Sequence, residues 1–208
     1  MNKTILSTLI ALFSLVSLQG AFSDRLSIKL RLAYLETVDE SKAFSALGID
    51  FASDAISVED KWIPEFDITY VLTDNLLAEV VLTLPQDHTV RLAGVGKLGE
   101  LTHLPPTFSL VYAFRNDSNF TPYVSAGVNV TWILDEDLSV AGVGLGLDEF
   151  SVGFAAGIGI SYKLSDTWEA DASVKYIQLS SAVKAGGSKL TTATLDPYLY
   201  SFGLTYNF

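Results

Sequence analysis

The sequence predicts an all-β fold, an eight-stranded antiparallel transmembrane β-barrel with short periplasmic turns and long extracellular loops. Three observations support this prediction: an apolar leader at the amino terminus, eight segments of alternating apolar residues, and an aromatic strand at the carboxyl terminus. From Tyr198 to Phe208 every second residue is large and apolar, which is the period of a strand with one apolar face. A membrane barrel needs such a strand, because its last strand closes against the first and faces lipid.

The amino terminus is typical of an exported protein. Lys3 precedes an apolar run from Ile5 to Leu18, and small residues follow. The run has roughly 14 residues against the ~20 that a spanning helix needs, so a signal peptide is favoured over a membrane anchor. We therefore expect a signal peptide over residues 1–23 and a single outer-membrane barrel domain over residues 24–208.

The alternation defines eight strands of about 10 residues, the length of a tilted membrane strand. They are expected at 26–34, 62–71, 76–84, 106–114, 123–132, 151–162, 168–177 and 198–208. Short polar turns at 73–75, 115–119 and 165–167 alternate with long connections at 35–61, 85–105, 133–150 and 180–196. This alternation and the even strand count predict that both termini are periplasmic. A soluble lipocalin-like barrel, with the apolar face inward, is the alternative.

The composition limits the classes of function. The chain has 13 Lys and Arg against 24 Asp and Glu, and its net charge of −11 argues against a nucleic-acid partner. It has no Cys, so neither disulfides nor thiolate chemistry are available. An acidic, aromatic-rich exported chain of this kind fits a protein integral to the outer membrane of a Gram-negative bacterium.

Charged side chains recur on the inward face of the predicted strands. By strand phase these are Lys29, Arg31, Glu65, Asp67, Glu79, Glu169, Asp171 and Lys175. Eight strands leave no aqueous channel, and unpaired buried charges are costly, so these groups should pair. We assign Lys29, Arg31, Glu79, Glu169, Asp171 and Lys175 to a charged plug in the lumen. Nearer the outer ends, Ile63, Val81, Ile177 and Leu179 point inward and are expected to line an apolar, ligand-binding mouth.

A set of short motifs resembles a known family. The motifs are Thr73–Leu76, Pro85–His88, His103–Thr107, Pro122–Asn129, Leu195–Tyr198 and Tyr206–Phe208. Each is modest alone, but in this order, from Leu26 to Phe208, they resemble the OmpW family of small outer-membrane proteins. The resemblance implies an eight-stranded barrel that lets small apolar molecules cross the outer membrane. The external loops and Lys61–Glu65 depart from the family pattern, so loop-specific properties do not carry over.

The leading hypothesis is therefore passive passage of small hydrophobic molecules through the apolar mouth, with lateral exit between strands. Pro64, Pro105 and Pro106 lack the N–H that a ladder needs and could mark that exit, although strand-entry turns explain them equally well. The alternative is a surface interaction, adhesion or receptor protein acting through acidic extracellular loops. Expected partners are outer-membrane lipid and lipopolysaccharide, hydrophobic solutes, and the assembly machinery, which would recognise Tyr206 and Phe208.

Other motifs predict little chemistry. Gly94–Gly99 spells GxGxxG, but a dinucleotide site needs a preceding strand and a following helix, and neither is expected. His88 and His103 could meet across a long connection, yet zinc would need further nitrogen or sulfur ligands. Ser109 could approach His103 as in a lipid-modifying enzyme, but no third group is evident. We expect no enzyme activity, cofactor or metal.

Overall fold

The structure, a computed structural model, describes residues 23–46 and 48–208. The expected signal peptide lies almost entirely outside the described residues, and the described part begins with a short 3-10 turn, η2 (Ser23–Arg25). No helix among the described residues is long and apolar enough to cross a membrane.

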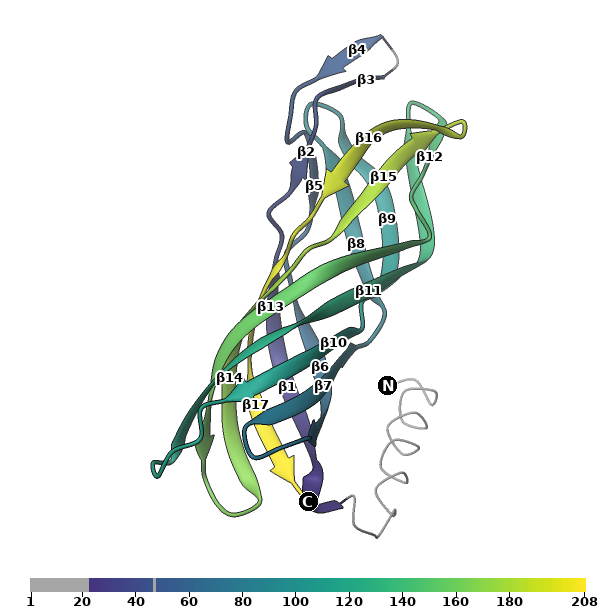
Figure 1. Ribbon diagram of the computed structural model, residues 1–208. Coiled ribbons are helices and arrows are strands. Elements are labelled where there is room, and N and C mark those ends of the chain that lie inside the picture. The colour runs from purple at the N-terminus through teal and green to yellow at the C-terminus, as the bar shows by residue number, and fades with distance from the viewer. Residues whose placement is uncertain (1–22, 47) are drawn as a thin grey trace.

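Eight antiparallel strands close into a barrel, which confirms the predicted fold (Figure 1). They are β1 (Leu26–Glu36), β6 (Lys61–Val71), β7 (Leu76–Thr83), β10 (Thr107–Ala113), β11 (Phe120–Val140), β13 (Phe150–Lys163), β14 (Trp168–Ile177) and β17 (Tyr198–Asn207). Each pairs with its neighbours along the chain, and β17 closes against β1 with Leu30 opposite Leu204. The short turns and the carboxyl terminus lie at one end of the barrel, here called the turn end (Figure 1).

The opposite end, here called the hairpin end, differs from the prediction. The connections are long, as expected, but they are mostly hydrogen-bonded hairpins that continue the wall rather than irregular loops (Figure 1). The added strands are β2 (Glu40–Ser41), β3 (Phe44–Ala46), β4 (Ile49–Phe51), β5 (Ile56–Val58), β8 (Gln86–Leu92), β9 (Gly96–Leu104), β12 (Val143–Gly146), β15 (Ser180–Ala185) and β16 (Ser188–Thr194). The backbone groups of these segments are therefore satisfied by pairing beyond the eight predicted strands.

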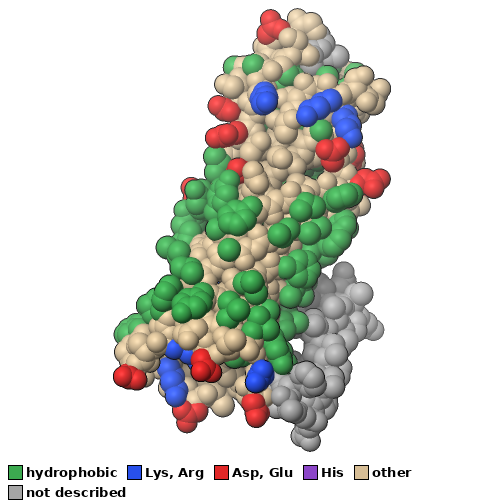
Figure 2. Space-filling view, in the orientation of Figure 1, with side chains coloured by type: hydrophobic (Ala, Val, Ile, Leu, Met, Phe, Trp, Pro, Cys, Tyr) green, Lys and Arg blue, Asp and Glu red, His purple; other side chains and the backbone are tan. Residues whose placement is uncertain are grey.

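The outer wall is apolar because the period-two pattern puts one face of each strand outside. Leu30 is 60% exposed and Ile158 is 64% exposed, although both are large aliphatic residues in the middle of strands. Hydrophobic side chains form a band around the visible face, with Lys, Arg, Asp and Glu gathered above and below it (Figure 2). Such a band is what a lipid-facing wall requires, so the soluble alternative with an apolar interior and charged exterior is wrong.

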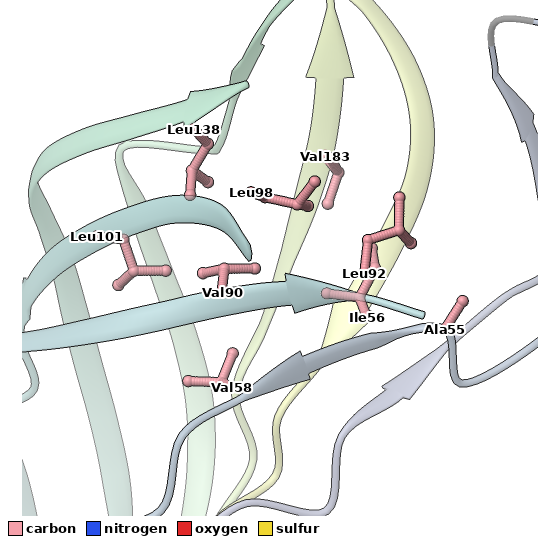
Figure 3. Packing of buried hydrophobic residues seen from close by; sticks show 9 residues of the cluster. All are labelled: Ala55, Ile56, Val58, Val90, Leu92, Leu98, Leu101, Leu138 and Val183. Carbon is pink, nitrogen blue, oxygen red and sulfur yellow. The ribbon is translucent and has the colours of Figure 1, made fainter. Parts of the chain in front are cut away.

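The interior changes character along the barrel axis. At the hairpin end, nine buried side chains from β5, β8, β9, β11, β15 and adjoining segments point toward one another and form what we call the upper core (Figure 3). They are Ala55, Ile56, Val58, Val90, Leu92, Leu98, Leu101, Leu138 and Val183. A second apolar layer follows below, made of Ala33, Leu35, Ile63, Ala155, Ile177 and Leu199. Charged side chains occupy the next layers.

Candidate functional site: an apolar mouth above an ionic plug

The four residues predicted to line the mouth come together. Ile63, Val81, Ile177 and Leu179 are all buried and all border one small cavity of about 30 Å³. They come from β6, β7 and β14 and from the segment that follows β14, and each points inward because the strands alternate. We keep the name mouth for these four residues. Their role in binding a ligand remains a prediction.

A second cavity, of about 50 Å³, lies in the upper core. The two cavities share part of their lining, namely Val58, His103, Thr131, Leu179 and Leu195. The two cavities therefore adjoin, and we call them together the apolar path. Both cavities are far smaller than a drug-sized pocket, so the path is closed in this conformation and side chains must move to admit a solute.

Below the mouth, buried ion pairs fill the lumen. We call this group the plug network, and its members are Lys29, Arg31, Glu65, Asp67, Glu79, Asp171 and Lys175. Arg31 bonds to Glu65, Asp67 and Asp171, and its Nη1 lies 2.9 Å from an oxygen of Asp171. Lys29 lies 3.2 Å from Glu79. The network thus joins β1, β6, β7 and β14 across the lumen.

Local sequence explains the compactness of the network. Gly203 of β17 is paired with both Arg31 and Asp171, and a Cβ there would collide with the backbone oxygen of Leu30. Glycine therefore lets β17 lie close to the backbone of β1 at Leu30 and Arg31. The hydroxyl of Tyr123 donates to Asp171 at 3.0 Å and satisfies an acceptor that Arg31 does not.

The structure corrects the predicted plug in two respects. Glu169 lies outside the network: its Oε1 accepts a hydrogen bond from Asn207 Nδ2 at 3.1 Å, beside a turn-end cavity of about 400 Å³. Strand phase pointed Glu169 inward correctly, but it lies at the start of β14, where the lumen opens. Conversely, Glu65 and Asp67 belong to the network. Phase also placed them inward, so sequence alone had the signal to include them.

His88 and His103 stack with ring centroids 4.8 Å apart and an interplanar angle of 5°. Both are buried, and His88 Nδ1 lies 3.2 Å from the carbonyl oxygen of Glu59. Burial lowers the pKa of both side chains, that of His103 to about 3, so both are neutral at pH 7. Among the residues that the structure describes, no three His, Asp or Glu side chains are arranged to hold a metal ion.

Two other motifs lie in a different structural setting from the one that their chemistry needs. A strand, β8, does precede Gly94–Gly99, contrary to expectation, but β9 follows where a dinucleotide site needs a helix. Ser109 is buried on β10, where it lies opposite Glu79 and Gly127, whereas His103 lies opposite Gln86 and Ile133. Neither motif therefore assembles the groups that its proposed chemistry needs.

The three prolines singled out in the sequence lie beside places where a strand ladder ends. Pro64 is paired with Leu32 inside the β1–β6 ladder, but on its other side the β6–β7 ladder ends next to it, at Glu65 and Thr83. At Pro105 and Pro106 the ladder is also interrupted. Pairing of β7 with β10 reaches Val81 and Thr107, and pairing of β8 with β9 begins at Gln86 and His103. We call the intervening gap, between residues 82–85 and 104–106, the seam.

The aromatic carboxyl terminus ends on the outer wall at the turn end. Tyr206 packs against Trp168 and Phe208, with ring centroids 5.0 and 4.9 Å apart. The backbone N–H of Phe208 donates to the carbonyl oxygen of Leu26 at 3.2 Å, so the last residue continues the ladder by which β17 closes against β1. Its role as an assembly signal remains a prediction.

A closed antiparallel barrel with an apolar outer band and a plugged lumen defines an outer-membrane β-barrel protein. The chain belongs to the OmpW family, whose model matches residues 23–208. It is 36% identical to outer membrane protein W of Vibrio cholerae over 152 residues, which cover 67% of this chain and 70% of that protein. It is 23% identical to outer membrane protein AlkL of Ectopseudomonas oleovorans over 161 residues, covering 74% and 69%. The crystal structure of OprG from Pseudomonas aeruginosa superposes with a TM-score of 0.77 at 27% identity, covering 91% and 98%.

Proposed function

We propose that this barrel lets small hydrophobic molecules cross the outer membrane passively. They would enter at the hairpin end, which is extracellular in this proposal, and leave sideways through the wall. The supporting observation is the change of chemistry along the lumen, from an apolar upper core and mouth to the plug network. An apolar chain gains about 0.8 kcal/mol for each CH₂ that it buries in the first region and meets paired charges in the second. Passage of an apolar solute straight through the plug network to the turn end is therefore unfavourable.

The seam supports the lateral exit. Thr83, Pro105 and Thr107 border the same cavity as the mouth residues, so the interrupted part of the ladder adjoins the lower end of the apolar path. A wall without ladder hydrogen bonds opens at lower cost than a paired one. A solute that leaves there enters the lipid that surrounds the outer band. In this proposal the short turns and both termini are periplasmic, as is usual for such barrels.

The experiment is uptake of a labelled apolar solute by cells that produce each variant. Val81→Asp and Leu179→Asp should reduce uptake severely, because each introduces an unpaired carboxylate at the mouth. Val95→Asp is the matched control, since Val95 is 48% exposed in the β8–β9 turn and should leave uptake unchanged. Heat-modifiable migration in detergent verifies that each variant is folded. Undiminished uptake by both mouth variants contradicts the proposed route.

The alternative function, surface interaction, has one specific observation in its favour. The β3–β4 hairpin extends beyond the rest of the barrel (Figure 1), and Ile49 at its tip is 54% exposed. Deleting residues 44–51 should abolish attachment to a partner under this alternative and leave solute uptake intact. If the deletion strain loses attachment and the Val81→Asp strain takes up the solute normally, the interaction role is favoured.

A further inference from the structure

Two polar side chains, those of His88 and Thr83, border the lower end of the apolar path. Among the described residues, His88 Nε2 and Thr83 Oγ1 are buried without a hydrogen-bonding partner, and both residues border the mouth cavity. A buried polar group without a partner costs about 1–3 kcal/mol. Two such groups beside one cavity therefore point to a ligand that pairs with them.

Four other polar side chains at this cavity, those of Thr107, Asn129, Thr131 and Lys175, already have protein partners. Asn129 Nδ2 donates to Thr107 Oγ1 at 2.9 Å, and Thr131 Oγ1 donates to Asn129 Oδ1 at 2.6 Å. Lys175 Nζ faces the plug network, where it donates to Glu79 at 3.5 Å. His88 and Thr83 thus stand apart from a well-paired environment.

The chemistry of the two groups restricts the ligand. His88 Nδ1 faces the carbonyl oxygen of Glu59, which can only accept, so Nδ1 holds the hydrogen of the neutral ring. Because burial lowers the pKa of His88, the ring stays neutral at pH 7 and Nε2 is an acceptor. The Thr83 hydroxyl can donate or accept. A matching head group must therefore donate a hydrogen bond to Nε2 and also pair with the hydroxyl.

We propose that the mouth binds an alkyl chain with a hydroxyl head group, which donates to His88 Nε2 and accepts from Thr83 Oγ1. This inference rests on the proposed function and names the class of solute. The alkyl chain lies along the upper core, whose cavity adjoins that of the mouth. A carboxylate cannot donate to Nε2, an ammonium would bury its charge in a largely apolar cavity, and an alkane leaves both groups unpaired.

The cavity sizes agree with this arrangement. About 30 Å³ exceeds the space that one water needs, so a hydroxyl fits without rearrangement. The alkyl chain needs more space than the upper-core cavity of about 50 Å³ provides, so it must displace aliphatic side chains of the upper core. Since those contacts are apolar and non-directional, the chain replaces them with contacts of the same kind.

The experiment compares 1-hexanol with 1-chlorohexane, which has the same chain but no O–H. The full chain is refolded into lipid nanodiscs and titrated with each compound at equal membrane-phase concentrations. The ¹⁵N signal of His88 Nε2 reports binding. We expect the alcohol to bind about 10-fold more tightly and to shift that signal, because two hydrogen bonds distinguish the ligands.

Two variants and a control complete the experiment. Thr83→Val keeps the shape but removes the hydroxyl, and it should reduce the preference for the alcohol to about 3-fold. Thr83→Val combined with His88→Phe should abolish the preference, read from backbone amide shifts of the β8–β9 hairpin. Thr69→Val is the matched control: its hydroxyl is also buried and unpartnered, but it borders the turn-end cavity, so the preference should stay at the wild-type value.

The outcomes separate the two proposals. Equal affinity for both compounds in the wild-type chain overturns the hydroxyl site and leaves passage of hydrophobic molecules intact. Failure of both compounds to bind overturns both proposals. A preference that Thr83→Val and Thr69→Val reduce equally shows that the site is not at the mouth, and it overturns the assignment.

Discussion

The two halves of the lumen lie inside one barrel but are stabilised by different interactions. At the hairpin end the upper core and mouth pack aliphatic side chains, and burial there has no directional requirement. Below them the plug network depends on ion pairs with fixed partners, such as Arg31 with Asp171 at 2.9 Å. A solute can replace an aliphatic neighbour with its own carbon atoms. It cannot replace Arg31 without leaving charges unpaired.

This difference gives the two regions different tolerance to opening. Breaking a buried ion pair by removing one partner typically costs 3–5 kcal/mol. Parting apolar side chains around an apolar guest costs far less, because the guest restores the contacts. We therefore expect the lumen to open to an apolar solute at the hairpin end and to stay closed at the plug network.

The largest expected effect is that of Arg31→Met. The variant leaves Glu65, Asp67 and Asp171 without their common cation, and we expect it to lose at least ~3–5 kcal/mol of unfolding free energy or fail to fold. Any folded fraction should conduct ions in planar bilayers, whereas the wild-type chain should conduct poorly. Urea unfolding in lipid and single-channel recording are the measurements.

A surface ion pair provides the control for this variant. Lys97 pairs with Glu100 at 2.6 Å in the β8–β9 hairpin, where both side chains are about half exposed or more. Lys97→Met should change the unfolding free energy by about 0–1 kcal/mol. Equal effects of the two substitutions would contradict the view that the plug is the rigid half.

An intermediate effect is expected from Leu101→Ala in the upper core, where Leu101 is 5% exposed. Such a truncation costs about 2–5 kcal/mol in a packed core. Here the cost should appear locally, as faster amide hydrogen exchange in β8 and β9, while the strands around the plug keep their protection. Because the cavity grows, uptake of an apolar solute should rise.

The control for Leu101→Ala is Leu30→Ala, since Leu30 is 60% exposed on the outer band. It should alter neither uptake nor exchange in the hairpins. Slower uptake by Leu101→Ala than by Leu30→Ala would show that the upper core guides the solute rather than obstructing it.

The sequence predicted the membrane strands well because their evidence is local. A period of two decides which face of a strand is inward, so Ile63, Val81 and Arg31 could all be placed in the lumen before their neighbours were known. The family resemblance pointed to the same barrel. Strand phase does not give the position of a residue along the barrel axis or the partner of its side chain. Glu169 was therefore assigned to the plug although it lies at the rim.

The hairpin end was harder to predict because its pattern is interrupted. The β8–β9 register shifts between Val90 and Arg91, and β9–β11 shifts between Ile133 and Asp135. Each irregularity reverses the phase, so the alternation no longer extends along the whole segment. Pairing there also joins distant segments, such as β12 with β15, which sequence alone does not specify. The stack of His88 on His103, by contrast, joins neighbouring strands of one hairpin, β8 and β9.

The smallest expected effect concerns acid. Burial lowers the pKa of His103 to about 3, and that of His88 is also lowered, so both rings are neutral when the hairpin is closed. Glu59, Lys61 and Asp87 are the charged groups that act on His88, and Lys61 also disfavours a charge on His103. In an opened hairpin each ring would regain an ordinary pKa near 6.5.

The sign of the pH effect follows from these pKa values. A depressed pKa of the closed state means that stability is complete above about pH 6.5 and declines as the pH falls toward about 3. At pH 5 the loss from His103 alone is about 2 kcal/mol. Amide exchange in β8 and β9, corrected for its intrinsic pH dependence, should accelerate below pH 6.5, and exchange around the plug should not. The double variant His88→Phe and His103→Phe keeps two stacked rings without a titrating group and should lose this dependence. If the double variant retains the acceleration, acid acts through another group, and the histidine pair does not govern opening of the hairpin end.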